Sequence, residues 1–272
     1  MYFAASAVYV DVLHTDGSLN GNDMFSLGTR QLMGDIDFFP NNGDHQPGCD
    51  REPVQRLLKG KVISAIRHMM TCDHSRSVDL LARYLEERNN KECVPMAYRC
   101  RSWEEYENGN CSSCGPHGEN CAIVGEPKAI RKDYEDTKTR FPYYIKTTAN
   151  SPLCAYQYRI EFVLSHPVPS SRLVIAVSDR NGYTAMGETR LRDWTAGQAH
   201  AFVIASEVKI REIEGLRIGS DELIQELDLD HGPIVTRALV TPMNEWSDQL
   251  KRRMTLRVCH FRSLATRDQH MC

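Results

Sequence analysis

The sequence has no long hydrophobic run and no excess of positive charge. Its longest apolar stretches, residues 4–10 and 173–177, are much shorter than the roughly 20 consecutive residues that a membrane-spanning helix needs. The 33 basic and 36 acidic residues give a formal net charge of −3, so the chain lacks the basic field that nucleic acid requires. These absences exclude a transmembrane protein and a nucleic-acid partner, and a hydrophobic content of 41% excludes a disordered chain.

Cysteine, by contrast, is abundant, with ten residues at positions 49, 72, 93, 100, 111, 114, 121, 154, 259 and 272. An even number of closely spaced cysteines is typical of a disulfide-bonded protein from an oxidising compartment, so we expect secretion. Zinc binding by Cys100, Cys111, Cys114 and Cys121 is the alternative, because four thiolates hold zinc tetrahedrally. This set has a single C-x2-C pair where such zinc sites normally have two, and the spacing therefore favours disulfides.

The two halves of the chain have different hydrophobic patterns. In the first half, strand candidates at 8–13 and 34–39 are accompanied by a helical apolar spacing over 78–87. In the second half, period-two alternation predicts strands at 156–162, 173–177, 201–205, 208–218 and 254–261. The expected fold class is α/β plus all-β, with an α/β domain over residues 1–138 and a β-sandwich over residues 139–272.

Three segments of the first half, taken in order, resemble one enzyme family. They are Val10–Asp16 (VDVLHTD), Leu27–Asn41 (LGTRQLMGDIDFFPN) followed by Gln46–Cys49 (QPGC), and Cys72–Ser77 (CDHSRS). These segments are similar to the second half of the catalytic domain of the pancreatic, lipoprotein and hepatic lipase family. The all-β half is similar, by its pattern, to the PLAT-type sandwich of that family. The resemblance implies the C-terminal portion of an α/β-hydrolase domain, followed by a PLAT-like β-sandwich.

This resemblance implies a secreted enzyme that hydrolyses carboxylic esters of lipids, as a triacylglycerol lipase or a phospholipase A1, by Ser-His-Asp chemistry. His74 falls on the family's catalytic histidine. Cys49 and Cys72 look like the disulfide that closes a lid over residues 49–72, whose apolar side chains face the pocket or a lipid surface; an ordinary packed helix is the alternative. The implied partner is a lipid substrate at an oil–water or membrane interface. The resemblance specifies no cofactor and no protein partner.

The catalytic triad is incomplete in these 272 residues. An α/β-hydrolase carries its nucleophile in a Gly-x-Ser-x-Gly elbow ahead of the acid and the histidine. No such motif occurs, and the nearest imitation, Met24–Gly28 (MFSLG), lacks the first glycine. In the family, the catalytic aspartate precedes the strand at Val10–Asp16 by more residues than this chain has. We therefore expect the remaining carboxylates of this region to be structural, namely Asp11, Asp16, Asp35 and Asp37.

Other departures from the family concern calcium and the missing upstream strands. Phe3 and Ser6 stand where family members carry aspartates of a calcium site, so we expect no metal. The sequence is expected to be incomplete, with Met1 a misplaced start, and inactive as it stands because the serine and the aspartate are missing. The alternative is a non-catalytic lipase-like protein that binds lipid or a protein partner, in which His74 has no catalytic role. Cys93 and Cys154 have no family partner, so they either pair with each other or stay unpaired.

Overall fold

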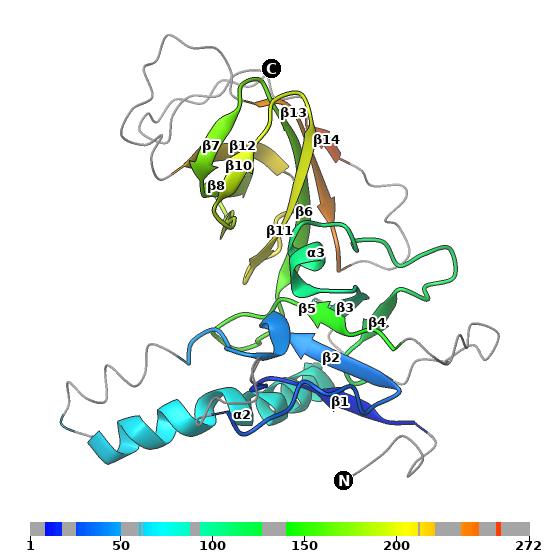
Figure 1. The fold of residues 1–272 in the computed structure, drawn as a ribbon, viewed down its shortest axis with the longest axis vertical. Coiled ribbons are helices and arrows are strands. Elements are labelled where there is room, and N and C mark those ends of the chain that lie inside the picture. The colour runs from blue at the N-terminus through cyan, green and yellow to red at the C-terminus, as the bar shows by residue number, and fades with distance from the viewer. Residues whose placement is uncertain are drawn as a thin grey trace. The chain divides into compact units, whose positions relative to one another are not determined.

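The computed structural model describes residues 9–17, 26–49, 60, 62–87, 93–126, 140–211, 213–220, 235–244 and 254–256. The chain divides into two compact units, shown in Figure 1: Met1–Tyr106 with Cys111–Ala155, and Glu107–Asn110 with Tyr156–Cys272. The expected boundary between residues 138 and 139 lies outside the described residues. Within the described ranges, no helix is both long and apolar enough to cross a membrane.

The first unit contains a five-stranded mixed sheet with the strand order β1-β2-β5-β3-β4. β1 and β5 are parallel to β2, whereas β3 is antiparallel to both β4 and β5. The strands are β1 (Asp11–Leu13), β2 (Ile36–Pro40), β3 (Met96–Arg99), β4 (Cys121–Ile123) and β5 (Tyr143–Ile145). All five residues of β2 are buried, as is typical of a parallel strand that is covered on both faces. Because β5 pairs with β2 and β3, residues 140–155 belong to this unit.

The long helix α2 (Val62–Glu87) runs beside β1 and β2 (Figure 1). Its side chains Leu80 and Tyr84 are buried in the same core cluster as Ile36 and Phe38. The helix expected over 78–87 begins already at Val62, because residues 62–87 contain no glycine or proline that would interrupt it. Two shorter helical segments complete the unit, η2 (Asn41–Gly43) and α3 (Trp103–Glu107).

The second unit consists of antiparallel strands. One sheet has the order β11-β6-β13-β14, a second has the order β12-β8-β9, and β10 pairs with β7. Their bounds are β6 (Tyr156–Leu164), β7 (Val168–Ser171), β8 (Leu173–Asp179), β9 (Thr184–Glu188), β10 (Arg192–Trp194), β11 (Ala199–Ser206), β12 (Ile213–Ser220), β13 (Val235–Pro242) and β14 (Met254–Leu256).

A single hydrophobic core joins the two larger sheets of this unit. Ile160 and Phe162 from β6 and Ile175 and Val177 from β8 all belong to it, so alternate residues face inward as predicted. This is the arrangement of a β-sandwich. The strand expected from residue 208 starts only at Ile213, because the Ile210 N–H donates to the Tyr158 hydroxyl (2.7 Å) instead. Residues 257–261 of the last predicted strand lie outside the described residues.

Four disulfides link the eight cysteines of the described segments: Cys49–Cys72, Cys93–Cys154, Cys100–Cys111 and Cys114–Cys121. The pair implied by the family resemblance, Cys49–Cys72, is therefore present, and Cys93 and Cys154 pair with each other. The bond from Cys93 to Cys154 closes a loop that contains β3, β4 and β5. Such long-range closure reduces the entropy of the unfolded chain and stabilises the first unit.

Candidate active site

The turn after β1 fixes the position of Asp16 through contacts with residues 26–28. The Asp16 carboxylate accepts a hydrogen bond from the Leu27 N–H (2.9 Å). Its main-chain carbonyl accepts hydrogen bonds from the Ser26 hydroxyl and from the Gly28 N–H (3.0 Å). A Cβ atom at residue 28 would lie 2.6 Å from that carbonyl oxygen, so the close approach requires glycine. Asp16 is thus held at both its main chain and its side chain.

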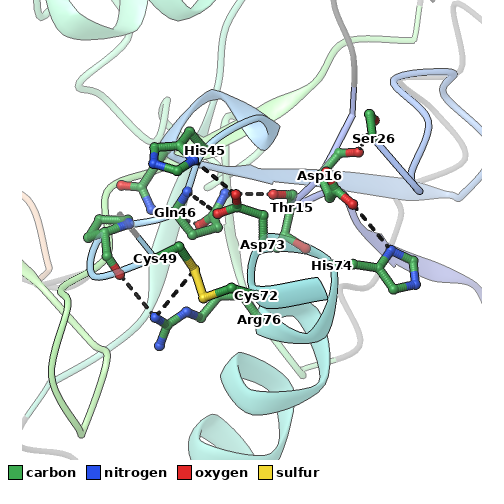
Figure 2. A network of polar contacts seen from close by, with 12 residues as sticks. Thr15, Asp16, Ser26, His45, Gln46, Cys49, Cys72, Asp73, His74 and Arg76 are labelled. Atoms are coloured by element: carbon green, nitrogen blue, oxygen red, sulfur yellow. Dashed lines mark hydrogen bonds and ion pairs between the residues drawn. A yellow bond between two sulfur atoms is a disulfide. The ribbon is translucent and has the colours of Figure 1, made fainter. Parts of the chain in front are cut away.

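Helix α2 presents His74 to this turn. The Nδ1 atom of His74 lies 3.7 Å from the Asp16 carboxylate, with the imidazole side chain 54% exposed and the carboxylate side chain 13% exposed. Figure 2 shows that His74 points toward Asp16, whereas its neighbour Asp73 points toward His45 and Gln46. The helix therefore carries an accessible imidazole whose one ring nitrogen faces a carboxylate. An accessible ring is one requirement of a general base, whereas the 3.7 Å separation from Asp16 is longer than a hydrogen bond.

Asp73 anchors the start of this part of α2 to the segment after β2. Its carboxylate accepts hydrogen bonds from the Gln46 N–H (2.6 Å) and from Nδ1 of His45 (2.9 Å). Burial raises the pKa of Asp73 above its usual value, while the Gln46 N–H and the His45 imidazole oppose that shift. Gln46 is itself fully buried and donates to the carbonyls of Thr15 (3.1 Å) and Pro40 (2.9 Å). The side chains around His74 are therefore fixed to the ends of β1 and β2.

A covalent bond and an arginine hold the same two segments together. The disulfide between Cys49 and Cys72 joins the segment after β2 to α2, two residues before His74. Arg76 donates a hydrogen bond to the Pro47 carbonyl (3.0 Å). Together with Asp73, these contacts (Figure 2) restrict the part of α2 that carries His74. Residues 50–59 and 61, which make up much of the expected lid, lie outside the described residues.

Comparison with known proteins identifies the family to which these motifs belong. The sequence profile described as "Lipase" matches residues 4–153, more than half of the chain. The chain belongs to the lipase family. This match includes β1, β2, the Cys49–Cys72 disulfide and His74, so the predicted family resemblance is confirmed.

Individual lipases are similar to the chain over part of their length. Lipase member H of Oryctolagus cuniculus is 30% identical over 184 residues, which cover 66% of this chain and 36% of the relative. Lipoprotein lipase of Gallus gallus is 33% identical over 155 residues, which cover 57% of this chain and 29% of the relative. Lipoprotein lipase of Homo sapiens is 28% identical over 221 residues, which cover 78% of this chain and 43% of the relative. The chain thus spans less than half the length of these lipases.

The four carboxylates that were expected to be structural have different surroundings. Asp37 is buried and bonds to His14, and Asp35 accepts the Val10 N–H (2.8 Å), so both connect β1 to β2. Asp11 lies in β1 itself. Asp16 differs from these three because its carboxylate also faces His74, a contact that the sequence did not predict. The two residues belong to separate motifs, and only the packing of α2 against β1 brings them together.

The other candidate site residues make no comparable arrangement. Ser26, in the imitation of the serine elbow, donates to the main chain of Asp16, on the far side of that residue from His74 in Figure 2. The four cysteines of the zinc alternative are bonded as Cys100–Cys111 and Cys114–Cys121, so they are not four thiolate ligands. The expectation of no calcium site rested on Phe3 and Ser6. Both residues lie outside the described residues.

Proposed function

We propose that the chain is part of a secreted enzyme that hydrolyses carboxylic esters of lipids, with His74 as its general base. The first unit would correspond to the C-terminal portion of a lipase α/β-hydrolase domain, and the second unit to a PLAT-like β-sandwich; the domain boundary then follows Ala155 instead of residue 138. The observation that carries the proposal is the half-exposed imidazole of His74, which lies on α2 inside the segment matched by the lipase profile. A general base must reach its substrate, and this exposure permits that.

In this reaction, His74 takes the proton from a serine hydroxyl as that oxygen attacks the ester carbonyl. The protonated imidazole then donates the proton to the leaving alcohol, and a water molecule attacks the acyl-enzyme in the second half of the cycle. No Gly-x-Ser-x-Gly elbow occurs among the 272 residues, so the serine is not supplied by this sequence. We expect these 272 residues alone to show no hydrolysis.

The segment between Cys49 and Cys72 supports a lipid substrate at an interface. Val62 and Ile63, at the start of α2, are 52% and 84% exposed. Exposed apolar side chains gain free energy when they contact a lipid phase instead of water. We therefore assign residues 49–72 to a lid that the substrate surface opens. The four disulfides support secretion, because such bonds persist in oxidising compartments.

Ester hydrolysis by a fused chain tests the proposal. The fusion places the upstream part of a lipoprotein lipase catalytic domain, which carries a serine elbow, before residue 1. We expect hydrolysis of emulsified triglyceride or phospholipid esters by the fusion, and a loss of at least about a thousandfold in kcat for His74→Ala. His45→Ala is the matched control, because His45 is 51% exposed in the same region and also contacts a carboxylate. Its activity is expected to be unchanged.

Two results would overturn the enzymatic assignment. One is a folded fusion with no activity on either ester class, which would favour the alternative, a non-catalytic lipase-like protein that binds lipid or a protein partner. The other is full activity in His74→Ala, which would remove His74 from the reaction.

A further inference from the structure

The turn after α3 carries an acceptor motif for N-linked glycans. Asn110, Cys111 and Ser112 form the one Asn-X-Ser/Thr triplet without a central proline in the 272 residues. In proteins that pass through the secretory pathway, the asparagine of such a triplet is modified where it lies in a surface loop. The motif is short, so its meaning depends on where the fold places the Asn110 side chain.

The fold fixes the residues before Asn110 and leaves Asn110 itself exposed. Asn110 ends the segment Glu107–Asn110, which belongs to the second compact unit. Its three preceding residues each contact an arginine of that unit: Glu107 with Arg190 (3.0 Å), Asn108 with Arg192 (3.2 Å) and the Gly109 carbonyl with Arg159 (3.0 Å). The Asn110 side chain is exposed and makes no hydrogen bond to the residues that the structure describes. A glycan on its amide nitrogen therefore displaces no such contact.

The middle residue of the motif is a disulfide cysteine. Cys111 is bonded to Cys100, which directly follows β3 and is buried, and both Asn110 and Cys111 lie in a turn. A transferase has to orient the asparagine amide and the serine hydroxyl together in its own active site, which requires a locally free chain. The disulfide closes the loop from residue 100 to residue 111 and removes much of that freedom. Transfer of a glycan therefore has to precede this disulfide.

We infer that Asn110 is an N-glycosylation site whose occupancy is set by competition with the Cys100–Cys111 bond. The co-reactant is an oligosaccharide linked to a lipid pyrophosphate. The amide nitrogen of Asn110 attacks the anomeric carbon of the first sugar, so that an N–C bond forms and the C–O bond to the pyrophosphate breaks. The amide loses one proton, and the lipid pyrophosphate leaves with the bonding electron pair. The inference rests on the secretion assigned under the proposed function and is independent of ester hydrolysis.

Expression of the chain in animal cells behind a signal peptide tests the site. A C-terminal tag with an Asn-Gly-Thr acceptor marks every molecule that has entered the secretory pathway, and only molecules with the tag glycan are scored. We expect an additional mobility shift on denaturing electrophoresis that peptide N-glycosidase removes, after which mass spectrometry finds an aspartate at position 110. Asn110→Gln and Ser112→Ala should each lose this shift. Marked molecules without a glycan at Asn110, with or without reductant during synthesis, would overturn the site.

Two cysteine variants test the competition. Cys100→Ser frees Cys111 without changing the motif, so the occupied fraction should rise, as it should when dithiothreitol is present during synthesis. Cys114→Ser is the matched control, because it breaks the neighbouring Cys114–Cys121 disulfide and should leave the fraction unchanged. Since transfer precedes folding, a variant that folds poorly still reports its occupancy. An unchanged fraction in Cys100→Ser, or an equal rise in Cys114→Ser, would refute the competition. A glycosylated but inactive fused enzyme would refute the proposed hydrolysis and leave this inference standing.

Discussion

Two imidazole–carboxylate pairs in the first unit occupy opposite environments. His14 directly follows β1 and Asp37 lies in β2, and their side chains are only 2% and 3% exposed. The distance between His14 Nε2 and Asp37 Oδ1 is 2.8 Å. His74 and Asp16 lie at the surface of α2 and the turn after β1, with a contact of 3.7 Å and a half-exposed imidazole. The same two side-chain types therefore meet in the buried interior and at the surface, where His45 and Asp73 form a further pair.

The number of ring contacts shows what each pair can do. His14 contacts Asp37 through Nε2 and the Thr29 carbonyl through Nδ1 (2.6 Å), and its ring stacks on Phe39 at 4.3 Å. With both nitrogens engaged and no solvent access, His14 cannot exchange a proton with a substrate, so its pair is structural. His74 meets a carboxylate at Nδ1 and exposes much of its ring. A carboxylate partner alone therefore does not identify a catalytic histidine, because a ring that solvent and substrate cannot reach has no access to the reacting atoms.

Removing the buried carboxylate is expected to have the largest effect. Asp37 accepts hydrogen bonds from the N–H groups of Met33 (3.0 Å) and Gly34 (3.1 Å) as well as from His14. Asp37→Ala leaves all of these groups unpaired inside the protein, and should lower the free energy of unfolding by about 3–5 kcal/mol. Urea denaturation measures this change. Asp16→Ala is the comparison variant, with an expected loss of about 1 kcal/mol; equal losses would contradict the distinction between the two pairs.

Asp11 is a carboxylate of the same sheet that has no histidine partner among the described residues, and its effect on stability should be smaller than that of Asp37. Burial raises the pKa of Asp11 from 3.8 to about 6, and the nearby carboxylates of Asp35 and Asp37 act in the same direction. The folded chain therefore binds more protons at Asp11 than the unfolded chain between about pH 4 and pH 6, so this group's contribution to stability is lost as the pH rises through that window.

Asp11→Asn should therefore stabilise the chain at neutral pH. Asp11 is only partly buried, and with an allowance for solvent screening we expect a gain of about 1 kcal/mol at pH 7 that disappears toward pH 4. Urea midpoints of both proteins across this range measure the effect. An identical pH dependence in the two proteins would show that Asp11 does not titrate with a raised pKa.

Sequence patterns predicted several of the longer strands, although β13 (Val235–Pro242), with eight residues, was not among them. β6 alternates apolar and polar residues over most of its length, β8 and β11 are mostly apolar runs of seven and eight residues with a polar end, and each was expected close to its observed place. β3, β4 and β5 have only three or four residues, too few for a period, and pairing with distant strands makes them extended. Their positions could not be predicted because the information lies in partners far along the chain.

The candidate site also has one residue that a local motif predicted, His74, and one that only the packing of the chain reveals, Asp16. His74 was predicted from the local motif CDHSRS, and the family match includes it. The approach of Asp16 depends on where α2 packs against the end of β1, and on a turn in which Gly28 permits a close main-chain contact. Neither is visible in a window of sequence around residue 16. A residue that acts at a site through another element of the fold therefore escapes motif-based prediction.

The smallest expected effect is the coupling between His74 and Asp16. A double-mutant cycle of His74→Ala and Asp16→Asn should give an interaction free energy of about 0.2–1 kcal/mol, because solvent screens a half-exposed pair. Added salt should reduce it, since the Debye length is only about 8 Å at physiological ionic strength. The corresponding cycle for His14 and Asp37 should give a several-fold larger value that salt hardly changes, because that pair is buried. If both cycles gave the same energy and the same salt response, exposure would not separate the two pairs, and His74 would lose its claim to a different role from His14.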